Sequence, residues 1–94
     1  MDVCVRVPTA LRELGGGRST LALDLREEAT ISDLLDAIGS AHPALERRIR
    51  DEQGRVRTHV NLFVGDENVR ALDGAGTVLR AGDEVSIVAA VSGG

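Results

Sequence analysis

The sequence predicts an α+β fold in which a mixed β-sheet packs against one main helix. Two observations support this prediction. Apolar residues alternate with polar ones in several segments, which is the period of half-buried strands. One segment between them, starting at Thr30, has its apolar residues at helical spacing instead. A sheet and a single amphipathic helix bury their apolar faces best against each other.

The N-terminal part is expected to form two strands joined by a hairpin. Valine occupies every second position over residues 3–7, and Pro8 ends this first strand. Leucine occupies every second position over residues 21–26, which predicts the second strand. The glycine run 15–17 between them is interpreted as a flexible hairpin loop. It is not interpreted as a phosphate-binding loop, because the Gly-Lys-Ser/Thr ending is missing and a strand follows it instead of a helix.

The helix is expected to begin at Thr30, a good N-cap residue, with Asp33 three positions later in a pattern close to a capping box. Its apolar stripe at i, i+3, i+4 and i+7 consists of Ile31, Leu34, Leu35 and Ile38. Gly39 and Pro43 are expected to end the helix, and residues 44–49 to add a turn or two of irregular helix.

The second half of the chain is expected to complete the sheet. Alternation predicts a third strand over residues 60–64, a short strand around Val69, a single turn at residues 78–79 and a last strand over residues 84–90. The order strand, strand, helix, strands fits a β-grasp, which needs no long crossover. At 94 residues we expect one domain over residues 1–94, with a flexible C-terminal tail over residues 91–94.

Composition argues against several functional classes. The net charge is −4, the basic residues are spread from Arg6 to Arg80, and Phe63 is the only aromatic residue, so nucleic acid is not an expected partner. The longest apolar run, residues 87–91, is too short to cross a membrane, and the chain opens with no signal-like segment. We therefore expect a cytoplasmic protein that does not bind membranes.

Candidates for catalysis inside the domain are few. Cys4, His42 and His59 lie far apart in sequence at no metal-ligand spacing, and no nucleophile has a neighbouring base. We expect no catalytic residue, no metal site and no cofactor bound by the chain itself. Cys4 is interpreted as structural, and both histidines as surface or turn residues.

The C-terminal end differs from these candidates. Gly93 and Gly94 leave a carboxylate without a Cβ on either neighbouring residue, which suits passage through a narrow channel. With Val91 and Ser92 they form an extended tail that reaches about 13 Å past the last strand. A frayed terminus would explain the two glycines equally well if they stood alone.

Three segments resemble a known family. Residues 82–94, with a Gly-Asp turn, a strand and a terminal Gly-Gly, resemble the end of the ThiS/MoaD sulfur-carrier proteins, which are ubiquitin-like. Residues 60–70 resemble the third strand and following turn of that family, and the opening 3–9 is most similar to CysO-type carriers of actinobacterial cysteine biosynthesis. Ala89-Ala90 departs from the pattern, because many members have prolines there, and this makes the tail less stiff.

This resemblance implies a function for Gly94. An E1-like enzyme would adenylate its carboxylate with ATP, and sulfur would then displace AMP to give a thiocarboxylate, which a sulfur-accepting synthase uses. The chain would be a co-substrate and not an enzyme. Val91, Ser92 and Gly93 would thread into the partner's active site, and a JAMM-type metalloprotease is a further partner that the resemblance allows.

Docking requires a surface, and strand alternation places Phe63 and Val88 on the outer face of the sheet. The alternative is that Phe63 packs under a loop or inside the core. Two other functions also stay open at this stage. One is a protein modifier that forms isopeptide bonds through Gly94, and the other is a ubiquitin-like interaction module without chemistry at its end.

Overall fold

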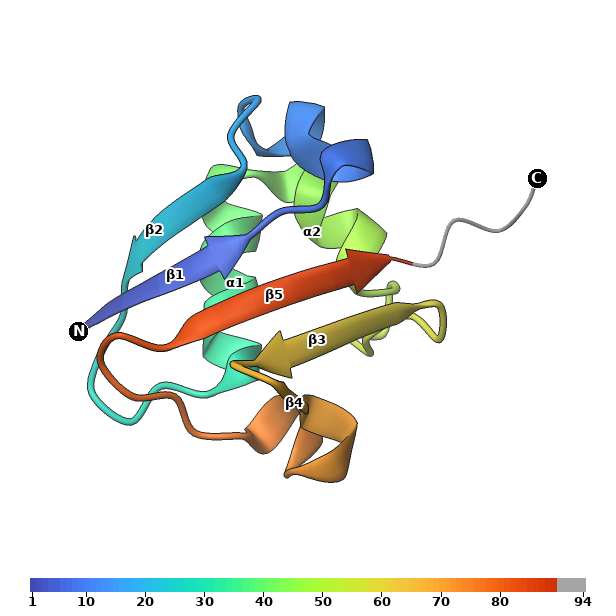
Figure 1. The fold of residues 1–94 in the computed structure, drawn as a ribbon. Helices are drawn as coiled ribbons and strands as arrows, with labels where there is room; N and C mark the ends of the chain where they lie inside the picture. The colour runs from blue at the N-terminus through green and yellow to red at the C-terminus, as the bar shows by residue number, and fades with distance from the viewer. Residues whose placement is uncertain (90–94) are drawn as a thin grey trace.

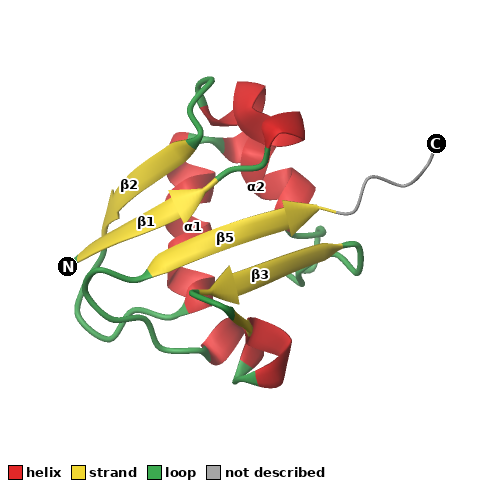
Figure 2. Cartoon of the chain, viewed as in Figure 1, coloured by secondary structure: helices red, strands yellow, loops and turns green. Residues whose placement is uncertain are grey.

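The structure, a computed structural model, describes residues 1–89. It confirms a mixed sheet of five strands in the order β2-β1-β5-β3-β4. Two α-helices cover one face of this sheet and lie behind it in Figures 1 and 2. The strands are β1 (Asp2–Arg6), β2 (Thr20–Asp24), β3 (Val60–Val64), β4 (Glu67–Asn68) and β5 (Glu84–Ala89). Ala90, the expected last residue of the final strand, lies outside the described residues.

Strand β5 occupies the centre of the sheet. It pairs in parallel with β1, where Val85 lies opposite Val5, and antiparallel with β3, where Ile87 lies opposite Leu62. Strand β2 pairs with the other edge of β1, and β4 extends β3 for two residues. Strand β5 is therefore paired on both sides over residues 84–86 and with β3 alone over residues 87–89.

Helix α1 (Ile31–Ala41) matches the predicted start and apolar stripe. Asp33 N donates to Thr30 Oγ1 at 3.3 Å and Thr30 N donates to Asp33 Oδ2 at 2.9 Å, which completes a capping box. The four stripe residues, Ile31, Leu34, Leu35 and Ile38, are all fully buried. The amphipathic spacing alone thus predicted which face of this helix meets the sheet.

The predicted end of α1 is wrong by two residues. Gly39 continues the helix, and α2 (Pro43–Ile49) begins directly after His42 as a regular α-helix. Close packing explains the glycine, because a Cβ at Gly39 would lie 3.3 Å from a carbon of the Glu46 side chain. Proline stands at the first position of α2, where its missing N–H costs nothing.

The connection between β1 and β2 is not the expected flexible loop. Residues 9–15 form the 3₁₀-helix η1 (Thr9–Gly15), which buries Leu11 and Gly15. A Cβ at Gly15 would lie 3.3 Å from Leu45 Cδ2, so glycine permits η1 to pack against α2. Gly16 and Gly17, with φ of 74° and 79°, then turn the chain into β2.

The second half also differs in its short elements. Val69 does not lie in a strand but begins the 3₁₀-helix η2 (Val69–Ala71), and β4 precedes it. The single turn expected at residues 78–79 lies earlier, as η3 (Gly74–Gly76). Val78 instead forms a bridge with Thr30 at the start of α1. This bridge ties the long connection before β5 to the helix.

Candidate functional site

The end of β5 is where the chain presents its C-terminal residues. Ala89, the last described residue, lies opposite Val60 at the start of β3, and residues 87–89 pair with β3 alone, because the pairing with β1 ends at Ser86. Gly94, the predicted sulfur-carrying residue, and Val91, Ser92 and Gly93, the predicted threading residues, lie outside the described residues. Their roles stay predictions, but in the sequence they follow the central strand of the sheet.

The outer face of the sheet carries the two predicted docking residues. Val60 and Leu62 are buried toward the helices, whereas Phe63, which follows Leu62, is half-buried and is not part of the hydrophobic core. Val88 is 46% exposed, and Val85 and Ile87 point inward. The placement of Phe63 and Val88 on this face agrees with the prediction, and their role in docking stays a prediction.

The register brings these two side chains close together. Phe63 lies opposite Ser86, and Val88 lies opposite Asn61, so Phe63 and Val88 are diagonal neighbours on adjacent strands. Diagonal neighbours on one face are within reach of an aromatic side chain. They form a small apolar patch that includes the last residue but one of β5, on the face opposite the helices.

A polar network beside this patch was not predicted from the sequence. Asn61 Oδ1 accepts hydrogen bonds from Asn68 Nδ2 at 3.1 Å and from Arg70 Nη1. Arg70 Nη2 also donates to the carbonyl oxygen of Val60 at 2.9 Å. No sequence period indicates such a network, because its members come from β3, β4 and η2.

The other polar candidates are scattered. Cys4 lies half-buried in β1, His42 joins the two helices, and His59 is exposed before β3. Among residues 1–89, no group of histidine, cysteine, aspartate and glutamate side chains could hold a metal ion. The structure does not bring Cys4 and the histidines together into a catalytic arrangement.

The pKa of Asp33 is lowered, and its surroundings are structural. The hydrogen bond from the Thr30 N–H is the main cause that lowers the pKa of Asp33. The Thr30 hydroxyl and the Arg26 guanidinium, which lies 2.8 Å from Asp33 Oδ2, act in the same direction. This carboxylate is ionised to cap α1, and it does not lie near the end of β5.

Comparison with known proteins identifies the family. The model of the ThiS family matches residues 5–94. The chain belongs to the ThiS family. As a ThiS-family member it is 40% identical over 84 residues to small archaeal modifier protein 1 of Haloferax volcanii, covering 89% of this chain and 91% of that protein. It is 37% identical over 97 residues to the sulfur carrier protein CysO of Mycobacterium tuberculosis, covering 100% of both.

Solved structures confirm the ubiquitin-like β-grasp of this ThiS-family chain. Its TM-score is 0.86 with small archaeal modifier protein 1 from Haloferax volcanii, at 33% identity and 100% coverage of both chains. It is 0.84 with a chain of the Amycolatopsis orientalis BexX/CysO complex, at 32% identity, covering 98% of this chain and 99% of that one. Urm1 from Trypanosoma brucei, at 18% identity, shares the fold with a TM-score of 0.79.

These relatives are small carrier and modifier proteins. The chain therefore belongs to a family of sulfur-carrier and ubiquitin-like modifier proteins. Within residues 1–89, no helix is long and apolar enough to cross a membrane.

Proposed function

We propose that this ThiS-family chain is a sulfur carrier whose working group is the Gly94 carboxylate. The observation that supports it most is full-length similarity to a protein named as a sulfur carrier, together with a Gly-Gly end that follows the central strand of the sheet. In the proposed cycle, a Gly94 carboxylate oxygen attacks the α-phosphorus of ATP and pyrophosphate leaves. A hydrosulfide ion then attacks the acyl carbon and displaces AMP, and loss of its proton leaves a thiocarboxylate.

The two steps follow from the chemistry of the carboxylate. A carboxylate is a poor electrophile, and adenylation supplies a leaving group. The resulting thiocarboxylate is ionised at neutral pH and is a good sulfur nucleophile toward an acceptor. An E1-like enzyme would supply the ATP site, and a sulfur-accepting synthase would consume the product, so the chain needs no cofactor of its own.

The fold is consistent with a domain that docks and a C-terminal segment that enters the enzyme. In the proposal, the patch of Phe63 and Val88 docks on the activating enzyme, while Val91, Ser92 and Gly93 thread Gly94 into its active site. The docked domain stays outside because its sheet is far wider than an extended chain. We place the reaction in the cytoplasm, where ATP is available, and a JAMM-type metalloprotease is a further partner that could process the terminus.

A second candidate function is favoured by a separate observation. The relative with 40% identity is named as a modifier protein. A modifier would use the same adenylated Gly94, but a lysine amine would displace AMP and form an isopeptide bond. The two functions share the first step and differ in the nucleophile that follows.

Mass spectrometry separates these functions. The chain is purified from its native host and its C-terminal peptide is measured. Replacement of one oxygen by sulfur at Gly94 is the expected result for a carrier. An isopeptide bond between Gly94 and lysines of other proteins, seen after trypsin as a remnant of residues 81–94, would support the modifier. A terminus that is unmodified and unconjugated in cells with ample sulfur would contradict both.

A further inference from the structure

Charge is divided between the two ends of the strands. The end that holds the start of β5 is acidic: Arg6, Arg26, Arg80 and the Met1 ammonium group lie there among Asp2, Asp24, Glu27, Glu28, Asp66, Glu67, Asp73, Asp83 and Glu84. Arg57 and Arg70 lie at the other end, beside the point where β5 leaves the sheet. The net charge of −4 is therefore unevenly distributed over the molecule.

Three arginines surround the point where β5 ends. Arg57 precedes β3, and its carbonyl oxygen accepts from the Val60 N–H at 3.0 Å, beside the pair formed by Val60 and Ala89. Arg70 reaches the same place from η2 and donates to the carbonyl oxygens of Arg57 and Val60. Arg55, two residues before Arg57, lines the same cavity as Arg70. We call Arg55, Arg57 and Arg70 the arginine cluster.

The arginine cluster has no acidic partner among residues 1–89. The ion pairs of arginine side chains in that range join Arg6 to Glu84, Arg26 to Asp33, and Arg50 to both Asp36 and Glu46. Asp51, four residues before Arg55, directs one oxygen to the backbone N–H groups of Gln53 and Arg55. The positive charge of the cluster is thus not neutralised by an ion pair within residues 1–89.

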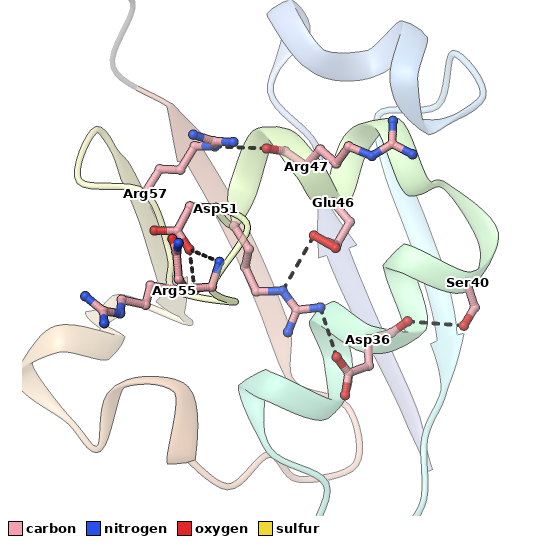
Figure 3. A network of polar contacts seen from close by, with 9 residues as sticks. Asp36, Ser40, Glu46, Arg47, Asp51, Arg55 and Arg57 are labelled. Atoms are coloured by element: carbon pink, nitrogen blue, oxygen red, sulfur yellow. Dashed lines mark hydrogen bonds and ion pairs between the residues drawn. The ribbon is translucent and has the colours of Figure 1, made fainter.

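Hydrogen bonds to the backbone hold the guanidinium groups of Arg57 and Arg70 in place. Arg57 Nε donates to the carbonyl oxygen of Arg47 at 2.9 Å, as Figure 3 shows. Helix α2, which contains Arg47, is itself fixed on α1 by Arg50, whose Nη2 lies 2.9 Å from Asp36 Oδ1. Guanidinium groups that are already ordered lose little conformational entropy when an anionic partner binds.

An apolar cavity adjoins the cluster. Its volume is about 290 Å³, and it is lined by the buried side chains of Val60, Leu62 and Val69 together with the exposed Arg55 and Arg70. A free phosphate or nucleotide would use only the charges of this surface. A peptide segment that combines carboxylates with an apolar side chain would use both charges and cavity, so the surface fits a protein better.

The length of the C-terminal segment limits which partner protein can bind the arginine cluster. Five residues separate Ala89 from the end of Gly94, and an extended chain of that length spans about 17 Å. When Gly94 reaches the reacting centre of an enzyme, the arginine cluster must therefore lie against the rim of that active site. We propose that the arginine cluster docks on an acidic segment at the entrance to the activating enzyme's active site. The proposal rests on the proposed function and adds the chemistry of the partner surface.

The test compares charge reversals at the two ends of the molecule. Arg55→Glu and Arg57→Glu change the cluster, and Arg80→Glu makes the same change of net charge at the acidic end, where its exposed side chain forms no ion pair within residues 1–89. The assay is ATP–pyrophosphate exchange by the E1-like enzyme from the same genome, with the chain as the varied substrate. Thermal melts check that each variant is folded.

We expect Arg55→Glu and Arg57→Glu to raise KM about tenfold at low ionic strength with kcat unchanged, because charges at an interface rim act mainly on association. The increase should shrink in about 0.5 M salt, where screening is strong. Arg80→Glu should leave KM within about twofold of wild type.

Three results would overturn the proposal. Equal increases for Arg80→Glu and Arg55→Glu would show an effect of net charge only, and unchanged KM in all variants would show that the cluster does not dock. Amide shifts at residues 55–57 and 70 on addition of ATP or inorganic phosphate alone would assign the cluster to an anion instead. If the wild type supports no exchange at all, the proposed function itself fails, and this outcome is distinct from the other three.

Discussion

A single aromatic side chain stands on the outer face of the sheet, beside an exposed valine. Phe63→Asp should weaken binding to the activating enzyme by about tenfold or more, because a buried carboxylate would replace an apolar contact. The melting temperature should change little, since Phe63 is not part of the core. Titration calorimetry with the enzyme measures the first effect, and a thermal melt measures the second.

Val88→Asp should act in the same direction but less strongly, since a valine offers less contact area than an aromatic ring. Ala22→Asp is a matched control, because Ala22 is exposed in β2, at the edge of the sheet. If Phe63→Asp unfolds the chain, the aromatic ring contributes to stability and its proposed role is wrong. If Ala22→Asp weakens binding equally, added negative charge alone explains the loss.

Leu35 lies at the middle of the buried stripe of α1 and is fully buried. Leu35→Ala should lower the free energy of unfolding by about 2 to 5 kcal/mol, because the truncated side chain leaves a cavity. Urea unfolding measures the change. A loss below about 0.5 kcal/mol would contradict the close packing of this helix against the sheet.

Orientation of single residues was largely predictable, and their polar contacts were not. Alternation correctly separated Phe63 from its buried neighbours, because one face of the sheet is covered by helices and the other is not. The contacts of Arg70 with Asn61 and Val60 depend on the path of η2 near the start of β3. Nothing in the local sequence determines that path.

At the scale of elements, the capping box makes the stability of α1 depend on pH. Asp33 has a lowered pKa in the folded chain, so its contribution is fully present above the unfolded pKa of about 4 and is lost as pH falls through the lower folded value. At pH values below about 4, the urea midpoint of the wild type should therefore decrease more than that of Asp33→Asn. Parallel pH profiles for the two chains would contradict this role of the carboxylate.

Elements with a clear period were predicted, and short elements were not. Helix α1 has both a stripe and a cap, whereas η1 has neither: Pro8 makes no side-chain cap, and only Leu11 and Gly15 are buried. Its 3₁₀ geometry is stabilised where Gly15 meets Leu45 of α2, which is a contact between distant segments. The same reason applies to η2 and η3, whose three residues are too short to show a period.

At the scale of the whole molecule, the proposed chemistry depends on the distance between the domain and the reacting carboxylate. Deleting Gly94 keeps a carboxylate but shortens the chain by about 3.5 Å. Misplacement of that size should reduce adenylation by about a hundredfold or more. ATP–pyrophosphate exchange and mass spectrometry of the terminus measure this loss.

Gly93→Val keeps the length and adds a β-branched side chain, so a smaller but still large loss is expected. Both variants should melt like the wild type, because the described core lies between Val3 and Ile87. Wild-type rates of thiocarboxylate formation in both variants would contradict the sulfur-carrier mechanism, since the terminus would then be insensitive to length and shape.

The overall architecture was predictable because one helix and several strands leave few ways to bury their apolar faces. The strand order was not, since the pairing of β1 with β5 joins the two ends of the chain. Residues 91–94 lie outside the described range, so the predicted roles of Val91, Ser92, Gly93 and Gly94 depend on the motif and on the family.

That pairing of β1 with β5 has a consequence for synthesis on the ribosome. Arg6 and Glu84, which form an ion pair across the two strands, are 78 positions apart in the chain. Until β5 has left the exit tunnel, β1 and β3 each lack their central neighbour, and long-range pairing of this kind forms late. A nascent chain cut short before β5 would lack the sheet's middle strand along with its terminal glycines. Folding and the proposed chemistry would therefore both require that β5 and the glycines after it have been synthesised.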